Sequence, residues 1–259
     1  MSQSIVPQSI LITGASSGIG KALAKAYAAP GRNLVLHGRH GDRLAAVAAD
    51  CEQGGATVRT GLVDVTDREA MADWITGVDR EVELDLVVAN AGISGFQDGD
   101  RDTVRRIFKV NVDGVFNTVQ PILPLMAKRG RGQLALMSSL AGFRGVATAP
   151  GYAASKAAVR SYGEGLRGQV SGQGIAVSVV CPGFVRTPMI DDNPFPMILV
   201  MEPERAATII QRGLERNKAR IAFPLRLYLA TLLFAVLPPA WTDPLFRRYQ
   251  GKEPPATSC

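Results

Sequence analysis

A tyrosine and a lysine four residues apart are the side chains whose types and spacing best fit proton-transfer chemistry. Tyr152 and Lys156 stand at positions i and i+4, so a helix would project both from one face. A phenol titrates at about 10, but an ammonium about 4 Å away at an effective dielectric of about 20 contributes roughly 4 kcal/mol, or about three pKa units. We therefore expect Lys156 to lower the pKa of Tyr152 toward neutrality, so that the phenol can exchange a proton with a carbonyl or hydroxyl oxygen.

Two more polar side chains stand where they could support this chemistry. Ser139 precedes Tyr152 by thirteen residues, at the end of an expected strand, where its hydroxyl could polarise the oxygen that receives the proton. Its neighbour Ser138 should point the other way, because side chains alternate along a strand. Asn111 lies inside an expected helix, where asparagine is unfavourable by propensity, which indicates a specific role. We expect Ser139 to be catalytic together with Tyr152 and Lys156.

A glycine-rich turn near the N-terminus points to a second chemistry, the binding of phosphate groups. Residues 13–20 read TGASSGIG and follow an apolar run. Glycines permit a tight turn and a close approach of the backbone, and the N-terminus of the following helix presents free N–H groups to a pyrophosphate. The spacing is GxxxGxG rather than GxGxxG, so this turn alone also fits a loop that only packs a helix on a strand.

Composition excludes several other kinds of chemistry. The 259-residue chain has two histidines and three cysteines, and none of them has the spacing of zinc ligands, so we expect no metal site. Neither histidine accompanies the GxSxG elbow of a serine hydrolase. Most of the net charge of +6 falls after Glu202, without a nucleic-acid-binding motif, so we expect no nucleic-acid partner. The scattered cysteines favour a reducing compartment and no targeting signal is visible, which indicates a cytoplasmic protein.

The elements that must position these residues follow a regular rhythm. Apolar β-branched runs alternate with Ala-rich amphipathic stretches up to about residue 223, which is typical of β-α-β units. Almost continuous apolar strands predict a parallel sheet covered on both faces. We therefore expect a doubly wound, Rossmann-type α/β fold with its ligand crevice at the carboxyl ends of the strands. The expected strands are 9–13, 33–38, 57–63, 84–90, 133–139, 175–181 and 220–223, and the expected helices are 19–29, 42–53, 67–77, 101–126, 152–169 and 203–216.

Taken together, the motifs resemble those of one enzyme family. The turn at 13–20 is followed in order by Asp64-Val65, Asn90-Ala91-Gly92, Asn111, Ser139, Tyr152-x-x-x-Lys156 and Pro182-Gly183-x-x-x-Thr187, each at an expected strand end or on a helix. This set covers roughly residues 8–223 and resembles the short-chain dehydrogenase/reductase family. The resemblance implies a dinucleotide-dependent oxidoreductase of carbonyls and alcohols.

The resemblance also implies roles for individual residues. Asn111 would complete a relay to Lys156 through water, Asp64 and Val65 would hold the adenine edge, and Thr187 would meet the nicotinamide carboxamide. The residues that we expect to bind the cofactor are Gly14, Ser16, Ser17, Gly18, Ile19, Gly20, Arg39, Asp64, Val65, Asn90, Ala91, Gly92, Tyr152, Lys156, Pro182, Gly183, Val185 and Thr187.

The end of the second expected strand bears on the choice of cofactor. An NAD-dependent enzyme of this architecture has an acidic side chain about 20 residues after the glycines, but no Asp or Glu lies between Asn33 and Gly41. Arg39 can form a forked contact with a 2′-phosphate, so we expect NADP(H) in preference to NAD(H). Ser17 stands where NADP-preferring relatives often have a second basic residue.

The segment after the nicotinamide turn bears on the substrate. Residues 188–200 are rich in apolar side chains and contain three prolines, where relatives have a mobile substrate lid. With Leu140, Phe143 and Met189 they predict a hydrophobic pocket and therefore a hydrophobic ketone or aldehyde as substrate. The same residues also fit ordinary core packing.

The C-terminal part departs from the family pattern. We divide the chain into a dinucleotide-binding catalytic domain, residues 1–223, and an apolar and basic extension, residues 224–259. Residues 227–242 have no charge, are flanked by basic residues and contain Pro238-Pro239, so the run is too short and too broken to span a bilayer. It fits peripheral membrane contact through residues 224–248, and equally a cover over the active site or a contact with a partner subunit. Relatives associate through helices equivalent to 101–126 and 152–169, which implies a homodimer or homotetramer.

The leading hypothesis is an NADP(H)-dependent carbonyl reductase or alcohol dehydrogenase that acts on a small molecule. The rival is a non-catalytic NADP-binding scaffold or sensor, because a fold does not fix a function. The complete set of Ser139, Tyr152 and Lys156 argues against that rival, since a scaffold needs none of them. Sugar-nucleotide epimerase chemistry would require a longer substrate domain than this chain has.

Overall fold

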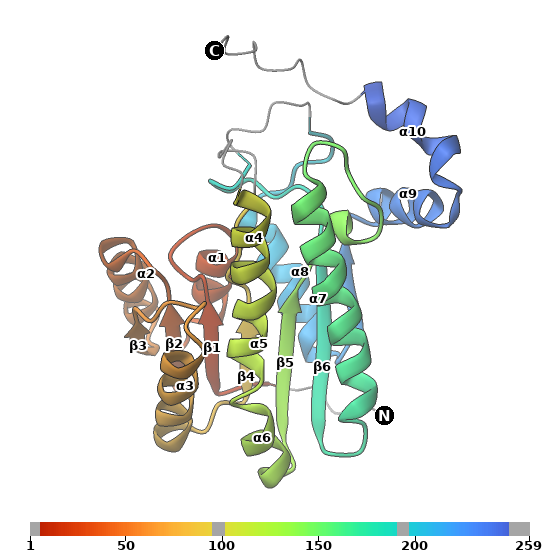
Figure 1. Ribbon diagram of the computed structural model, residues 1–259. Helices are drawn as coiled ribbons and strands as arrows, with labels where there is room; N and C mark the ends of the chain where they lie inside the picture. Colours follow the sequence, from red (N-terminus) through yellow and green to blue (C-terminus); the bar gives the residue numbers. More distant parts are fainter. Residues whose placement is uncertain (1–5, 95–101, 191–196, 249–259) are drawn as a thin grey trace.

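A seven-stranded parallel sheet between two layers of helices organises the computed structural model, which describes residues 6–94, 102–190 and 197–248 (Figure 1). The strand order is β3-β2-β1-β4-β5-β6-β7. The order reverses between β1 and β4, the point at which doubly wound sheets open a crevice for ligands. The strands are β1 (Ser9–Thr13), β2 (Asn33–His37), β3 (Thr57–Gly61), β4 (Leu86–Ala89), β5 (Gly132–Met137), β6 (Ile175–Pro182) and β7 (Arg220–Phe223). The doubly wound α/β fold expected from the sequence is therefore confirmed.

Side chains alternate along the strands and so build two apolar layers, one on each face of the sheet. On β1, Ile10 and Ile12 join the layer under one group of helices, and Leu11 joins the layer under the other. The helices of the first group are α1 (Gly18–Tyr27), α2 (Gly41–Gln53) and α8 (Pro203–Glu215). Those of the second group are α3 (Arg68–Val82), α4 (Thr103–Phe108), α5 (Gly114–Val119), α6 (Leu123–Arg129) and α7 (Pro150–Gln169), and they cover the face that is turned to the viewer in Figure 1.

The single helix expected from 101 to 126 is divided in the structure, so this expectation is wrong. α4 passes through a π-helical turn, η1 (Lys109–Asp113), into α5, and α6 begins only after a separate turn. Pro121 lies between α5 and α6 and lacks the N–H that a continuous helix would require, whereas Pro124 is in the first turn of α6, where that N–H needs no partner. Arg101 lies outside the described residues.

The apolar C-terminal run is split over two helices. α9 (Leu225–Val236) follows β7 directly, and α10 (Pro239–Arg248) begins after a break at Leu237 and Pro238. Both helices lie beyond the carboxyl end of β7, on the same side of the molecule as the other strand ends (Figure 1). Among the helices of the described ranges, none has both the length and the apolar character needed to cross a membrane.

Candidate active site

The glycine-rich turn connects β1 to α1 in a conformation that requires glycine. Gly14 and Gly18 have φ angles of +67° and +53°, in the left-handed region that side chains disfavour. A Cβ on Gly14 would lie 2.9 Å from Cα of Ala91, and a Cβ on Gly18 would lie 2.9 Å from Cγ2 of Thr187. Gly20 does not line the pocket beside the turn. A Cβ there would collide with the carbonyl oxygen of Gly14, so this glycine allows α1 to pack against the turn.

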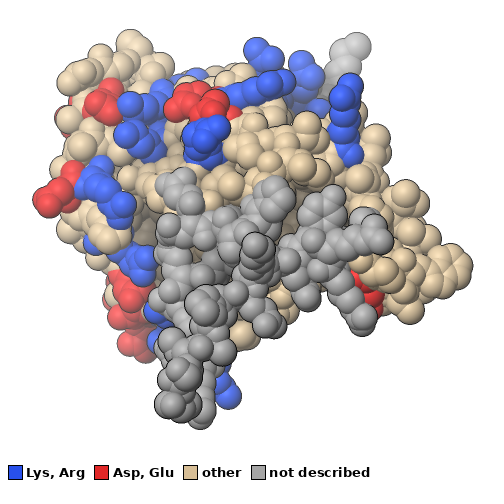
Figure 2. Space-filling model, turned by 90° about the horizontal axis from the view of Figure 1, so that it is seen from above, with Lys and Arg blue, Asp and Glu red and all other residues tan. Residues whose placement is uncertain are grey.

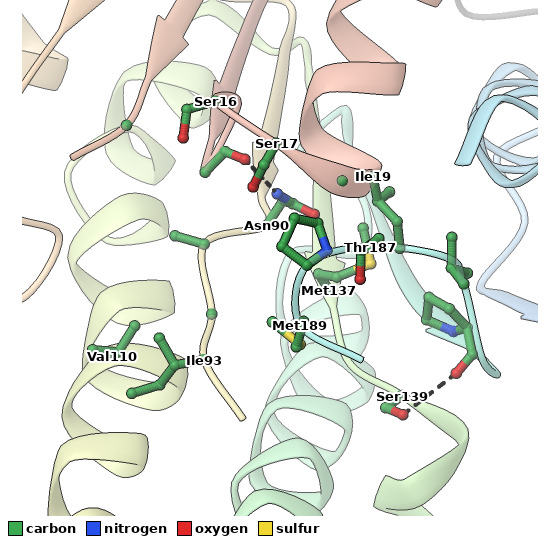
Figure 3. Close-up of a pocket in the computed structure, with 18 of the residues that line it drawn as sticks. Ser16, Ser17, Ile19, Asn90, Ile93, Val110, Met137, Ser139, Thr187 and Met189 are labelled. Carbon is green, nitrogen blue, oxygen red and sulfur yellow. Dashed lines mark hydrogen bonds between the residues drawn. The ribbon is translucent and has the colours of Figure 1, made fainter. Parts of the chain in front are cut away.

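The first turn of α1 has the features of an anion-binding site. Its N-cap residue, Ser17, makes no capping hydrogen bond with its side chain, and no acidic residue lies in the first turn. The N–H groups at a helix N-terminus have no partner within the helix, and they favour a negative group. Ser16, Ser17 and Ile19 line the pocket at this point (Figure 3). The residues present therefore fit the pyrophosphate of a dinucleotide.

The turn is joined to the end of β4 by a small network of hydrogen bonds. The Asn90 carboxamide donates to the carbonyl oxygens of Thr13 and Gly14, over 2.9 and 3.3 Å, and the second of these bonds is drawn in Figure 3. The Thr13 hydroxyl accepts from the backbone N–H groups of Asn90 and Ala91. Asn90, Ala91 and Gly92 all line the pocket. Asn90 thus has a structural role in fixing the turn, in addition to its position beside the ligand space.

Ser139, Tyr152 and Lys156 line the same pocket as the glycine-rich turn. Ser139 follows β5 and caps the short 3₁₀ helix η2 (Leu140–Gly142), where its hydroxyl accepts from the N–H of Ala141. Tyr152 and Lys156 lie on α7, as their spacing predicts. The Lys156 ammonium is buried, donates to the Met137 carbonyl oxygen over 2.9 Å, and lies 5.7 Å from the centre of the Tyr152 ring. The pocket therefore combines a phosphate-binding turn with a hydroxyl, a phenol and an ammonium.

The expected direction of the Tyr152 pKa is wrong for the structure. Burial raises the pKa of the phenol above its ordinary value, and a hydrogen bond with Ser139 acts in the opposite direction. Burial also lowers the pKa of Lys156 to about 8. The ammonium is directed at the Met137 carbonyl oxygen rather than at the phenol oxygen, which explains why desolvation outweighs the attraction that the i, i+4 spacing predicts.

Asn111 is fully buried beside the pocket without lining it. Its carboxamide oxygen accepts from the N–H of Ile93, and its nitrogen donates to the Ile93 carbonyl oxygen and to the Ser155 hydroxyl. A Cβ on Gly92 would lie 3.2 Å from the Asn111 oxygen and 3.4 Å from the Lys156 nitrogen. Asn111 therefore lies near Lys156 but uses its side chain to hold backbone, and its place in a proton relay stays a prediction.

The region after β2 brings together two arginines, of which only Arg39 was expected from the sequence. Arg39 lines the pocket as expected, and so does Arg43 from the first turn of α2. His37 also lines it, buried, with its Nε2 2.6 Å from the Val63 carbonyl oxygen, and burial lowers its pKa. Asp64 is not among the lining residues and accepts a hydrogen bond from the N–H of Thr66. That bond is the main reason why the Asp64 pKa is lowered.

The end of β6 and the segment that follows it complete the lining. Pro182, Gly183, Val185 and Thr187 line the pocket as expected, together with Met189. Leu140 and Phe143 do not, so their assignment to the cavity is wrong. Leu140 packs with core residues of β6 and Phe143 packs against Tyr228 of α9. Of the expected lid, residues 191–196 lie outside the described residues.

Several lining residues were missed because they are next to motifs rather than part of them. Ser138 was expected to face away from the site; its hydroxyl donates to the Lys156 carbonyl oxygen, and the residue still borders the pocket. Arg43 has no identifying signal in the sequence, because it reaches the pocket only through the position of the first turn of α2. The lining residues absent from our expected cofactor and catalytic sets are His37, Gly38, His40, Arg43, Ile93, Val110, Met137, Ser138, Pro188, Met189 and Ile190.

Within the described part of the chain, no group of three or more His, Cys, Asp or Glu residues could hold a metal ion.

Comparison with known proteins identifies close relatives of this arrangement. Residues 8–194 match the family model for short chain dehydrogenases. A protein described as an uncharacterized oxidoreductase from Myxococcus xanthus is 39% identical over 242 residues, which cover 92% of this chain and 96% of the relative. A short-chain dehydrogenase from Sphingobium yanoikuyae, solved with NADPH, superposes with a TM-score of 0.77 at 25% identity and covers 97% of this chain and 98% of its own. One from Mycobacterium paratuberculosis, solved with NAD, has a TM-score of 0.73 at 27% identity and covers 83% and 94%.

Proposed function

This chain belongs to the short-chain dehydrogenase/reductase family, and on that premise we propose that it transfers a hydride between NADP(H) and a hydrophobic ketone, aldehyde or alcohol. One observation supports this proposal best: Ser139, Tyr152 and Lys156 line the same pocket as the glycine-rich turn. A bound nicotinamide would supply or accept the hydride. We assign this chemistry to residues 1–223, with residues 224–259 as an extension, and the cysteine pattern favours a reducing compartment such as the cytoplasm.

The residues of the chain would then move and stabilise the proton. A phenol is protonated at neutral pH, and burial raises the pKa of Tyr152 further, so in the direction of reduction the phenol donates its proton to the carbonyl oxygen. The Ser139 hydroxyl donates a hydrogen bond to the same oxygen, and the Lys156 ammonium stabilises the phenolate that remains. The phenolate then recovers a proton from solvent. In the direction of oxidation the same groups work in reverse, and Tyr152 accepts the proton of the alcohol.

The test of the activity is NADPH consumption with ketones and aldehydes of increasing chain length, in the wild type and in Tyr152→Phe. We expect the variant to lose a factor of about 10² to 10⁴ in kcat/KM while it still binds NADPH. Tyr162→Phe is the matched control, because Tyr162 lies on the same helix and packs edge-on against Phe116, outside the pocket. Full turnover by Tyr152→Phe, or turnover of small polar carbonyls alone, would contradict the proposal.

The preference for NADP(H) rests on charge. Arg39 and Arg43 line one pocket, and no carboxylate takes the position after β2 that would bind a ribose 2′-hydroxyl. The relative from Sphingobium yanoikuyae was solved with NADPH, and the one from Mycobacterium paratuberculosis with NAD. Since these relatives differ in cofactor, the preference for NADP(H) depends on the two arginines. Arginine pairs with phosphate through forked, charge-assisted hydrogen bonds.

Substituting both arginines tests this preference. Each hydrogen bond to a charged group contributes about 1.5–3 kcal/mol, so we expect Arg39→Ala and Arg43→Ala each to raise KM for NADPH by about tenfold or more. KM for NADH should change little. Arg59→Ala is the control, because Arg59 pairs with Glu81 on the surface, away from the pocket. Equal effects on NADH and NADPH would rule out recognition of the 2′-phosphate.

The apolar side of the pocket supports a hydrophobic substrate. Ile93, Met137, Met189 and Ile190 lie among its lining residues, and Figure 3 shows Met189 between Ser139 and the glycine-rich turn. Apolar side chains near the reacting oxygen favour substrates that bury apolar area. We therefore expect kcat/KM to rise with the chain length of the ketone.

A further inference from the structure

The two C-terminal helices expose a row of large apolar side chains. On α9 these are Leu225, Leu229, Leu233 and Val236, with exposed fractions of 64%, 56%, 57% and 79%, and on α10 the indole of Trp241 is 73% exposed. The three leucines are spaced by four residues and so lie on one helix face. No residue of α9 is buried, although the helix is almost wholly apolar. We call these five side chains the α9–α10 face. A contiguous apolar patch of this kind is typical of an interaction surface.

The opposite side of the two helices is fixed to the body of the protein. A Cβ on Gly183 would lie 2.9 Å from the Leu227 side chain. The Tyr228 ring packs edge-on against Phe143, and its hydroxyl accepts from Arg220. On α10, the Thr242 hydroxyl and the Asp243 carboxylate accept from Arg144. The helices are therefore held with a defined side inward, and the α9–α10 face is directed outward as a consequence.

The charged residues of α9 and α10 indicate which kind of surface the α9–α10 face would bind. Between residues 225 and 244 the sequence has two charged side chains, Arg226 and Asp243, and Asp243 is paired with Arg144 at 3.1 Å. Arg226 is exposed, and the sequence of residues 225–248 has three arginines against one aspartate. In Figure 2 the lobe on the side of α9 and α10 is mostly tan. The surface thus combines apolar side chains with a positive balance, which fits an anionic surface.

The basic flank that the sequence suggested is smaller than expected. The Arg220 guanidinium binds Glu164 and Tyr228 and lies over the Phe143 ring. Arg216 and Lys218 precede β7, so they lie near the amino end of that strand, whereas α9 begins at its carboxyl end. Arg220 is therefore paired on the inner side of α9, and Arg216 and Lys218 belong to another surface.

The size of the patch favours a lipid surface over a second copy of the chain. α9 has twelve residues, so it is about 18 Å long and about 10 Å wide, and the two helices together offer a footprint on the order of 400 Å². A stable protein interface buries about 800 Å² on each partner. A bilayer requires no such shape complementarity, because apolar side chains and an interfacial tryptophan insert individually. We propose that the α9–α10 face docks on the surface of an anionic bilayer.

The test uses the full chain and vesicles, without any measurement of turnover. Flotation with vesicles of phosphatidylcholine and phosphatidylglycerol should bring the wild type to the lipid fraction, and Leu229→Glu/Leu233→Glu should lose about tenfold or more in partitioning. Leu62→Glu is the matched control, because Leu62 is equally exposed, at 61%, but follows β3.

Two further measurements test the role of charge and the insertion of tryptophan. Arg226→Glu should weaken binding to vesicles that contain phosphatidylglycerol more than it weakens binding to vesicles of phosphatidylcholine alone. Lipid should also shift the emission of Trp241 to shorter wavelength, a change that Trp241→Phe abolishes.

Three outcomes would overturn the proposal. The wild type could stay out of the lipid fraction with both kinds of vesicle. The double variant could float as well as the wild type. The wild type could form dimers without lipid that the double variant splits into monomers, which would make the α9–α10 face a contact between copies. Since none of these outcomes depends on cofactor or substrate, they are independent of the proposed reaction.

Discussion

Lys156 affects both the stability of the protein and the chemistry proposed for the site. Its ammonium is buried and has one hydrogen-bond partner among the described residues, the carbonyl oxygen of Met137. Burial lowers its pKa from an ordinary value of 10.5 to about 8, so most molecules still have the charge at neutral pH. The protein therefore maintains a buried charge beside Tyr152 at a cost to its own stability.

That cost predicts how stability depends on pH. A shift from 10.5 to about 8 corresponds to about 3 kcal/mol that burying the charged form takes from the folded state. The destabilisation of the folded state by the buried ammonium has its full value below pH about 8. It disappears above pH about 10.5, where Lys156 is neutral in both the folded and the unfolded state. The free energy of unfolding of the wild type, relative to Lys156→Met, should therefore rise by up to about 3 kcal/mol as pH increases through this window.

Urea denaturation of both proteins at several pH values measures this difference. The exposed Lys128→Met variant supplies the baseline for the loss of a surface lysine. A difference between wild type and Lys156→Met that stays constant with pH would mean that Lys156 is not desolvated in the folded protein.

That Ser139, Tyr152 and Lys156 lie close together could be predicted from sequence, but their electrostatic state could not. The i, i+4 spacing placed Tyr152 and Lys156 on one helix, and Ser139 was expected at a strand end next to them. The pKa of Tyr152 depends on how deeply α7 packs and on where the Lys156 nitrogen points, and both are set by tertiary contacts. Arg43 was missed for a related reason, since only the fold shows that the first turn of α2 reaches the pocket.

At the scale of elements, strands were easier to predict than helices. Each of the seven expected strands is present, with ends that differ by at most two residues from the expected ones. The inner strands are buried, almost continuous apolar runs, whereas the edge strand β3 is largely exposed or half-buried. The helix at 101–126 was wrong for two reasons: Pro121, a local signal, lies in the break between α5 and α6, and the π-helical turn contains Asn111, which bonds to the backbone of Ile93 eighteen positions away. No local periodicity reports such a contact.

Two glycines of α7 test how closely this helix packs on the sheet. A Cβ on Gly163 would lie 2.6 Å from Cγ2 of Val179, whereas a Cβ on Gly165 would have no neighbour within 4 Å. Gly163→Ala should therefore lower the free energy of unfolding by about 1–3 kcal/mol through overpacking. Gly165→Ala should raise it by up to about 1 kcal/mol, since alanine favours the helix.

The pair is its own control, because both substitutions add the same methyl group to the same helix. Urea denaturation that showed equal stabilisation by both would contradict the close packing of α7 on β6. A loss of stability in Gly165→Ala that depends on protein concentration would instead place Gly165 in a contact between copies, as the expected homo-oligomer would require.

At the scale of the whole molecule, the pocket and the α9–α10 face are neighbours. Gly183 lines the pocket and also packs against Leu227 of α9, so the outward face of this helix is about one helix diameter, on the order of 10 Å, from the pocket wall. If both proposals hold, docking would place the pocket close to the lipid. An apolar ketone concentrates in a bilayer, so the local supply of substrate would then exceed its supply from water.

This neighbourhood predicts a dependence of KM on lipid that differs between substrates. With a long-chain ketone dissolved in anionic vesicles, Leu229→Glu/Leu233→Glu should raise KM by about tenfold and leave kcat unchanged, because neither leucine lines the pocket. With a short, water-soluble ketone the variant and the wild type should have the same KM. A rise in KM for both ketones would show that the substitutions disturb the pocket through Leu227, and unchanged values for both would show that substrate reaches the site from water even when the α9–α10 face is docked.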